Sequence, residues 1–412
     1  MPNSLLTINM ITREAIRLFR NSNAFIQAID HQYDDSFAID GAKIGDSLRI
    51  RLPNDYTVRT GAAASVQDTS EQSTTLSLAT QKGIDVSFST RERTMSLDDY
   101  SIRVLAPMIN NLAGAVAMDI MSGVEGGVCN LVANQDGANT IINPVASTYL
   151  QAGANLANNS APMGNRQIVN NPITEARVVA SLAGLLAPAD TIGRQYSMGK
   201  MYTALGFDWM MDQTVLTHTN GTFTSGTVNG ASQSGTSITM NAITGTLEAG
   251  DIVTFASVNA VNRVTKASTG QLRQFVITAD AATAATSISI YPGIVAGGAS
   301  YNSVTGDGAA QYQTVTAAPA NAAALSLALS VAASAQYRKN IAFAPDAVTM
   351  ATADLVMPRG VHEAAREQFD GLSMRMLTAY VPGTDQLITR LDILYGYLWI
   401  RPEWACLVAD AL

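Results

Sequence analysis

The sequence predicts an α+β protein that carries an inserted all-β domain. Three observations predict this class. Apolar and polar residues alternate in two segments within residues 42–90, which is the period of a half-buried strand. Apolar residues recur every three or four positions over residues 97–134, which is the period of a helix. Between residues 219 and 317 only seven of 99 residues are charged, and short strand patterns alternate with glycines.

An amphipathic helix is predicted over residues 4–30, where apolar residues recur at helical spacing. The charged residues that we single out beside and after it are Arg13, Arg17, Asp30, Asp34 and Asp35. A helix of this kind usually packs on its own protein through the apolar face. The alternative is an arm that docks a partner.

Residues 42–90 predict a long two-stranded hairpin. Leu48, Ile50 and Leu52 alternate with Arg49 and Arg51, and a second alternating strand covers residues 84–88. Small and polar residues between the two strands predict a flexible tip. A solitary hairpin is marginal in water, and nothing nearby in the sequence covers it. We therefore expect another subunit to pack against it.

A spine helix is predicted over residues 97–134, and it would be about 55 Å long if continuous. Further helices are predicted at residues 173–187 and in the Ala-rich stretch 320–336, and a last apolar strand at 397–400. The predicted strands of the charge-poor region are residues 237–240, 251–255, 274–277 and 287–291.

Charge and composition argue against several function classes. The net charge is −8 and the isoelectric point about 4.9, whereas proteins that grip nucleic acid need a basic surface. No apolar run is long enough to span a membrane, and the N-terminus lacks the features of a secretion signal. We expect synthesis in the cytosol and no membrane partner.

The residues that usually carry chemistry are scattered. Cys129 and Cys406 match no metal or redox spacing and are expected to be buried thiols. His362-Glu363 begins a motif like that of zinc proteases, but Arg366 stands where the second metal ligand would be. Residues 193–200 resemble a phosphate loop with one residue too many. The sequence therefore predicts no catalytic residue, no metal and no cofactor.

The order of these elements resembles that of HK97-like major capsid proteins of tailed bacteriophages. Within that group the chain looks most like the P22 coat protein family, whose members carry an insertion domain. Three short motifs carry this resemblance: Gly206-Phe207-Asp208 before the insertion, Gly250-Asp251-Ile252 with Phe255 inside it, and Arg401-Pro402-Glu403 near the C-terminus. The family's charged insertion loop is replaced here by the uncharged residues 221–235.

The resemblance implies a division into five parts. They are an N-terminal arm at 1–41, an extended loop at 42–90, a peripheral domain with the spine helix at 91–164, an A-domain at 165–218 and 318–412, and an inserted β-barrel domain at 219–317. It also implies a coat protein that assembles into pentamers and hexamers of an icosahedral phage head enclosing double-stranded DNA. Assembly would take place in the bacterial cytoplasm, and the finished location would be the virion.

The resemblance further implies partners and contact residues. The partners are other copies of the chain, a scaffolding protein, a portal protein and the enclosed DNA, and the use of decoration proteins is left open. The expected subunit-contact residues are Arg49, Arg51, Arg59, Asp68 and Glu71. The charged residues of the arm named above are expected to face the scaffolding protein.

Two other readings remain open at this point. The Ser/Thr/Gly-rich region 219–317 is also typical of a secreted or surface adhesin-like protein, although a secretion signal is missing. An enzyme whose catalytic residues are dispersed through the sequence is the third reading.

Overall fold

The computed structural model describes residues 8–31, 47–52, 55–56, 61–64, 73–89, 105–181, 201, 203–297, 311–358, 360–383 and 385–412. These residues divide into two units. The first unit lies within Met1–Ile50, Thr74–Ile120 and Val348–Ile400, and the second within Arg51–Ser73, Met121–Ala347 and Arg401–Leu412. Each unit is described by itself.

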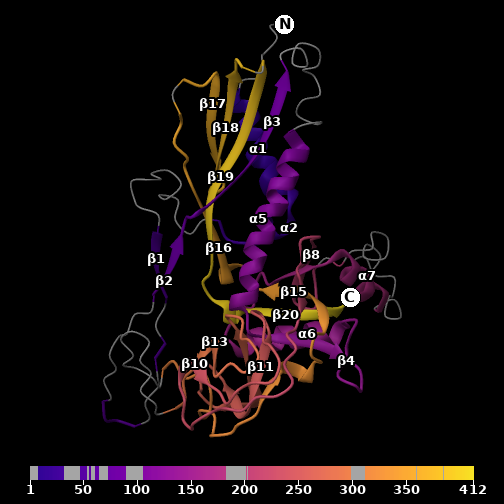
Figure 1. Cartoon of the computed structure of the whole chain (residues 1–412), viewed down its shortest axis with the longest axis vertical. Helices are drawn as coiled ribbons and strands as arrows, with labels where there is room; N and C mark the ends of the chain where they lie inside the picture. The colour runs from indigo at the N-terminus through magenta and orange to yellow at the C-terminus, as the bar shows by residue number, and fades with distance from the viewer. Residues whose placement is uncertain are drawn as a thin grey trace. The chain divides into compact units, whose positions relative to one another are not determined.

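The first unit is built on one long strand, β19 (Gln386–Trp399), which pairs on both of its edges (Figure 1). β18 (Leu372–Val381) and β16 (Val348–Ala353) lie along one edge, and β3 (Thr80–Ser89) lies along the other. β17 (Glu363–Phe369) pairs with β18, and all of these pairs are antiparallel. The alternation of apolar residues in β19 leaves Leu387, Leu391 and Ile393 on one face of the sheet, where they are buried.

Two helices cover that apolar face. α1 (Ile8–Ser22) packs on β17 and β18 through Ala15, Ile16 and Phe19, none of which has exposed surface. The first part of α5 (Ala106–Gly127) lies beside β3, where the Lys82 ammonium donates to the Ala115 carbonyl over 3.1 Å. Apolar burial of this kind is what stabilises a helix against a sheet.

The predicted N-terminal helix is confirmed within the described residues, with a break. α1 ends at Ser22, and α2 (Ala24–Ala28) starts after Asn23, whose side-chain oxygen accepts hydrogen bonds from the backbone N–H groups of Phe25 and Ile26. Asn23 is an N-cap residue, and this local pairing competes with a continuous helix.

Residues 42–90 contain a two-stranded pairing as predicted, but its second strand is not the one expected near residue 86. β1 (Ser47–Arg51) pairs with β2 (Ser73–Ser77), and β3 pairs with β19, so that Ile84 lies opposite Leu391. Alternation fixes which side chains share a face but carries no information on the partner strand. β3 therefore packs against β19, a strand that lies about 300 residues later in the sequence, and no nearby segment is needed to cover it.

The predicted spine helix is shorter than its apolar pattern. α5 covers residues 106–127, while residues 97–104 lie outside the described residues. Residues 131–135 form a strand, β4 (Leu131–Gln135), instead. Its Val132 side chain packs in the core of the second unit. Pro107 occupies the first turn of α5, where its missing N–H costs no helical hydrogen bond.

An eight-stranded mixed sheet forms the first half of the second unit. Its order is β5 (Ile141–Ile142), β4, β20 (Ala405–Ala411), β15 (Gln336–Phe343), β6 (Gln167–Asn170), β8 (Phe207–Met211) and β7 (Thr203–Ala204), with β9 (Thr217–Thr219) on β15. α6 (Ala146–Asn158) and α7 (Pro172–Ser181) belong to the same half. Tyr149 and Leu156 of α6 are fully buried in its core, and the rings of Tyr149 and Trp209 lie 4.5 Å apart.

A five-stranded antiparallel sheet forms the other half. Its order is β10 (Gly235–Thr239), β13 (Ser287–Ile294), β12 (Ser268–Ile277), β11 (Ile252–Val261) and β14 (Leu325–Leu327). It has a core of its own, in which the rings of Phe255 and Phe275 meet edge to face at 5.5 Å. The four strands predicted in the charge-poor region are therefore confirmed. That this region is an inserted domain stays a prediction.

The Ala-rich helix predicted at 320–336 is wrong. This stretch contains β14 and a short 3-10 helix, η4 (Ala328–Ser330), instead. Its side chains from Ala323 to Leu327 alternate between buried and exposed, because Leu325 and Leu327 enter the core of the five-stranded sheet. Alanine fits either period, so that the high helix propensity of alanine was overridden by tertiary burial.

Asp251 joins the start of β11 to its surroundings. Its carboxylate has no exposed surface and contacts the His218 Nε2 atom at 2.8 Å. It also accepts hydrogen bonds from the backbone N–H groups of Gly221 and Glu248, at 3.1 and 2.9 Å. A buried carboxylate is tolerated only when its oxygens are satisfied in this way.

Asp251→Ala is expected to lower the free energy of unfolding by about 3–5 kcal/mol, because it removes the buried carboxylate that accepts from two backbone N–H groups and contacts the His218 imidazole. Glu248→Gln is the matched control, since no hydrogen bond of the Glu248 side chain is found among the described residues. Urea unfolding of both variants measures the difference. An equal effect of the two substitutions would contradict the structural role given to Asp251.

Candidate assembly surfaces

The exposed face of α1 carries the arginines that the sequence singles out. Arg13 has three quarters of its side chain exposed and lies 3.4 Å from the Glu367 carboxylate. Arg17 donates to Glu14 at 2.7 Å, and this hydrogen bond lowers the pKa of Glu14. Exposed ion pairs of this kind add little to stability, so that both cations remain accessible to another protein.

The acidic residues predicted for the same surface behave differently. Asp30 follows α2 and is tied to β16, where its carbonyl accepts from the Met350 N–H at 3.0 Å and its carboxylate accepts from the Thr349 hydroxyl at 3.1 Å. Asp34 and Asp35 lie outside the described residues. The structure therefore brings Arg13 and Arg17 together on one helix and gives Asp30 an intramolecular role.

The end of this segment is fixed by a close backbone approach. Gly371 has a φ of +74°, and a Cβ atom there would lie 2.3 Å from the His31 carbonyl oxygen. His31 itself is buried, and burial lowers the pKa of its imidazole. Only glycine combines this conformation with this contact.

The β1 strand carries two of the predicted contact residues, Arg49 and Arg51. Both are exposed, whereas Ile50 between them is buried against Leu76 and Ala351. The alternation in the sequence predicted this arrangement correctly. The other three predicted contact residues, Arg59, Asp68 and Glu71, lie outside the described residues.

The face of the β19 sheet opposite the helices carries a charge network that the sequence did not reveal. Arg375 and Arg390 both bind the buried Asp392 carboxylate, at 2.6 and 2.8 Å. Arg390 also lies 3.6 Å from Asp85 on β3, and its side chain is about half exposed. These residues come together only through the pairing of three strands, so that their spacing in the sequence gave no signal.

Gly83 makes room for this network. A Cβ atom at residue 83 would lie 2.3 Å from the Asp392 carboxylate and 2.7 Å from the Leu391 carbonyl. Both distances are far below van der Waals contact, so that any larger side chain at this position must displace the carboxylate from its two arginines.

Among the described residues, those that were considered for chemistry lie apart from one another. No three His, Cys, Asp or Glu side chains gather at metal-binding distance in the part of the chain that the structure describes. His362 is exposed just before β17, and the residues that follow it form a strand instead of the helix that a zinc protease needs. Cys129 and Cys406 are both buried as predicted, and burial raises the pKa of the Cys406 thiol to about 12. The loop at 193–200 lies outside the described residues.

Comparison with protein families decides the assignment. A family model described as "P22 coat protein - gene protein 5" matches residues 3–407. The chain belongs to the P22 coat protein family. It is therefore a coat protein, its described residues have the α+β character that the sequence predicts, and the adhesin-like alternative gains no support. No helix among the described residues is both long and apolar enough to cross a membrane.

Solved structures of other phages resemble this coat protein. Mycobacterium phage Che8 gives 12% identity over 94% of this chain and 90% of the other, with a TM-score of 0.48. The capsid of cyanophage P-SCSP1u gives 10% identity over 89% and 84%, with a TM-score of 0.44. The CUS-3 coat protein I-domain gives 25% identity over 25% of this chain and 93% of its own, with a TM-score of 0.19. No curated protein matches the coat protein at a significant level.

Gly83→Ala is expected to destabilise the coat protein by about 2–3 kcal/mol, because the added methyl group collides with Asp392 and the β19 backbone. Gly114→Ala is the matched control: a Cβ there meets nothing within 4 Å, and α5 should gain about 0.5–1 kcal/mol. Thermal unfolding of both variants measures the two shifts, which should have opposite signs. Equal shifts of the unfolding temperature would contradict the close contact of residue 83 with Asp392 and Leu391.

Proposed function

We propose that this coat protein assembles into pentamers and hexamers, which close into an icosahedral head around double-stranded DNA. The family match over residues 3–407 is the observation that carries the proposal. The low share of charged residues, 14%, supports it, because neutral surface favours association between copies. Assembly would take place in the bacterial cytoplasm and end in the virion.

Subunit contact is proposed for the exposed face of β1. Arg49 and Arg51 point away from the buried Ile50, so that a neighbouring copy could bind them without disturbing the cluster beneath. Residues 42–90 would then contribute Arg59, Asp68 and Glu71 to the same contact. Many weak contacts of this kind suffice in a closed shell, since each copy is held by several neighbours at once.

The basic face of α1 is proposed to meet the scaffolding protein. The apolar face of α1 packs on the sheet of its own chain, whereas Arg13 and Arg17 lie on the other face and expose their guanidinium groups. A complementary acidic surface would dock there mainly through steering and specificity, and salt would weaken the docking. A portal protein at one vertex completes the proposed set of partners.

Enclosure of DNA without sequence-specific binding is the last part of the proposal. The net charge of −8 supports it, because an acidic wall does not hold the phosphate backbone. Residues 219–317 are proposed as an inserted domain of each subunit, and the five parts predicted above as its domain order.

The assembly proposal predicts large, uniform particles when the chain is expressed with a scaffolding protein. Sedimentation velocity and negative-stain microscopy measure their size and symmetry, and expression without the scaffolding protein is the control. If only small monomers form at every concentration and with every scaffold tried, the proposal is wrong.

Replacing Arg49 and Arg51 together by Gln is expected to slow assembly while the monomer keeps its unfolding free energy within about 0.5 kcal/mol, as exposed substitutions usually do. Ile50→Ala is the contrast, since it should destabilise the monomer by roughly 2–5 kcal/mol through the cavity it leaves. Light scattering follows assembly and urea unfolding follows stability. Unchanged assembly of the double Gln variant would remove β1 from the proposed contact.

A further inference from the structure

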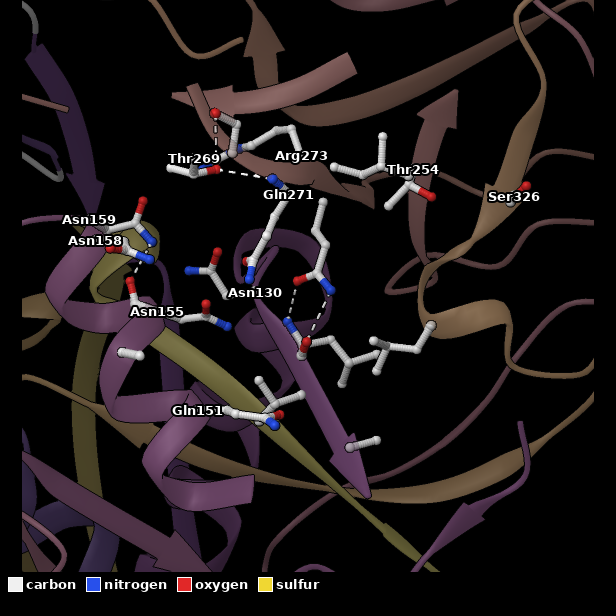
Figure 2. Close-up of a pocket in the computed structure, with 18 of the residues that line it drawn as sticks. Asn130, Gln151, Asn155, Asn158, Asn159, Thr254, Thr269, Gln271, Arg273 and Ser326 are labelled. Atoms are coloured by element: carbon white, nitrogen blue, oxygen red, sulfur yellow. Dashed lines mark hydrogen bonds between the residues drawn. The ribbon is translucent and has the colours of Figure 1, made fainter. Parts of the chain in front are cut away.

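The second unit contains a cavity of about 760 Å³, which is the size of a ligand pocket. One wall comes from β4 and α6, and the facing wall from β11, β12, β14 and the segment after it. Figure 2 shows Asn155 and Asn158 of α6, with Asn159 directly after the helix, on one side of this space and Thr269, Gln271 and Arg273 of β12 across from them.

Seven of the 22 lining residues carry side-chain amides, and three of these amides have no hydrogen-bond partner among the described residues. These are Gln151 and Asn158 on α6 and Gln271 on β12. Gln274 differs, because its amide pairs with both backbone groups of Leu131, at 2.7 and 3.0 Å, and so joins the two walls. The unpartnered amides offer both donors and acceptors to whatever enters the cavity.

Arg273 is the one charged residue in the described lining. Its guanidinium donates to the Cys129 sulfur over 3.7 Å, and its Nε atom is buried without a hydrogen-bond partner among the described residues. No described carboxylate forms an ion pair with it. A guanidinium in this state favours a ligand that brings a carboxylate of its own.

The chemistry of the lining selects one ligand class. A nucleic acid needs several phosphate-binding cations and aromatic platforms for its bases, and this lining has one cation and no aromatic residue. Pockets for apolar small molecules are lined mostly by hydrophobic side chains, whereas half of the lining residues here carry an amide or a hydroxyl, beside the guanidinium of Arg273. An extended peptide carries alternating backbone donors and acceptors, which amide side chains match.

We infer that this cavity binds an extended, acidic segment of a neighbouring copy of the coat protein, with a carboxylate on Arg273 and backbone groups on Gln151, Asn158 and Gln271. This inference rests on the proposed function, because assembly places further copies beside each subunit in fixed positions. The chain has the required chemistry, since it carries 33 acidic residues against 25 basic ones.

Photo-cross-linking of assembled particles tests the inference. Leu272 lines the cavity and is 44% exposed, so that a diazirine-bearing aliphatic amino acid can replace it and leave the amides in place. Irradiation should give a covalent dimer whose cross-linked peptide contains Asp or Glu. Arg273→Gln should lower the dimer yield about ten-fold, the effect of losing a hydrogen bond to a charged group.

Two controls separate binding from folding. The same diazirine residue at Val264, which is 71% exposed and outside the lining, should give cross-links that Arg273→Gln does not change. Asn158→Leu removes one exposed, unpartnered amide and should lower the Leu272 yield while thermal unfolding stays unchanged. This second variant decides the matter if Arg273→Gln particles fail to assemble.

Three outcomes in intact particles would overturn the inference. They are the absence of a dimer from position 272, a dimer through a segment without acidic residues, and a cross-link to a different protein. Failure of the unsubstituted chain to form particles is seen by sedimentation before irradiation, and it would overturn the proposed function itself.

Discussion

The fold depends on a small number of carboxylates that are buried and paired. Asp251, Asp392 and Asp410 have no exposed surface. Asp410 accepts from Arg177 at 2.9 Å and from Thr174 at 2.7 Å, and thereby ties α7 to β20. A buried charge that loses its partner is strongly destabilising, so that each of these groups permits one arrangement of the segments around it. In a chain with few charges, these constraints weigh more than usual.

The pairing of β19 shows how such a constraint sets register. Arg375 lies directly opposite Asp392, and Gly83 lies opposite the same residue on the other edge. A slip of one residue would turn Asp392 toward the face that α1 and α5 cover, where apolar side chains could not satisfy it. The charge network therefore favours one register of β19. In this register the sheet presents the apolar face on which α1 packs, and Arg13 on the other side of α1 stays in solvent.

Local patterns predicted local structure. Helical spacing located α1 and the middle of α5, and alternation placed Arg49 and Arg51 on the exposed face of β1. Partners that are distant in the sequence could not be predicted, because the period of β3 fits any strand of matching pattern. The charge network on β19 and the polar cavity could not be predicted for the same reason, because their residues meet only through strand pairing and packing. The alanines of 320–336 led to a wrong helix prediction. Their helix propensity is weaker than the burial of Leu325 and Leu327, which requires a strand.

Charged residues in the interior of each unit differ from those at its surfaces in how well they are paired. Carboxylates that hold the fold together are satisfied within the chain, and they are unavailable to a partner. Arg273 is left in a polar cavity without a carboxylate, and Arg13 has only a long, exposed ion pair. Cations that lack a strong internal partner keep donors available for a carboxylate on another molecule, and such a pair adds specificity to the contact. A coat protein that assembles from identical acidic copies has that carboxylate on every neighbour, and association can therefore satisfy what folding leaves unpaired.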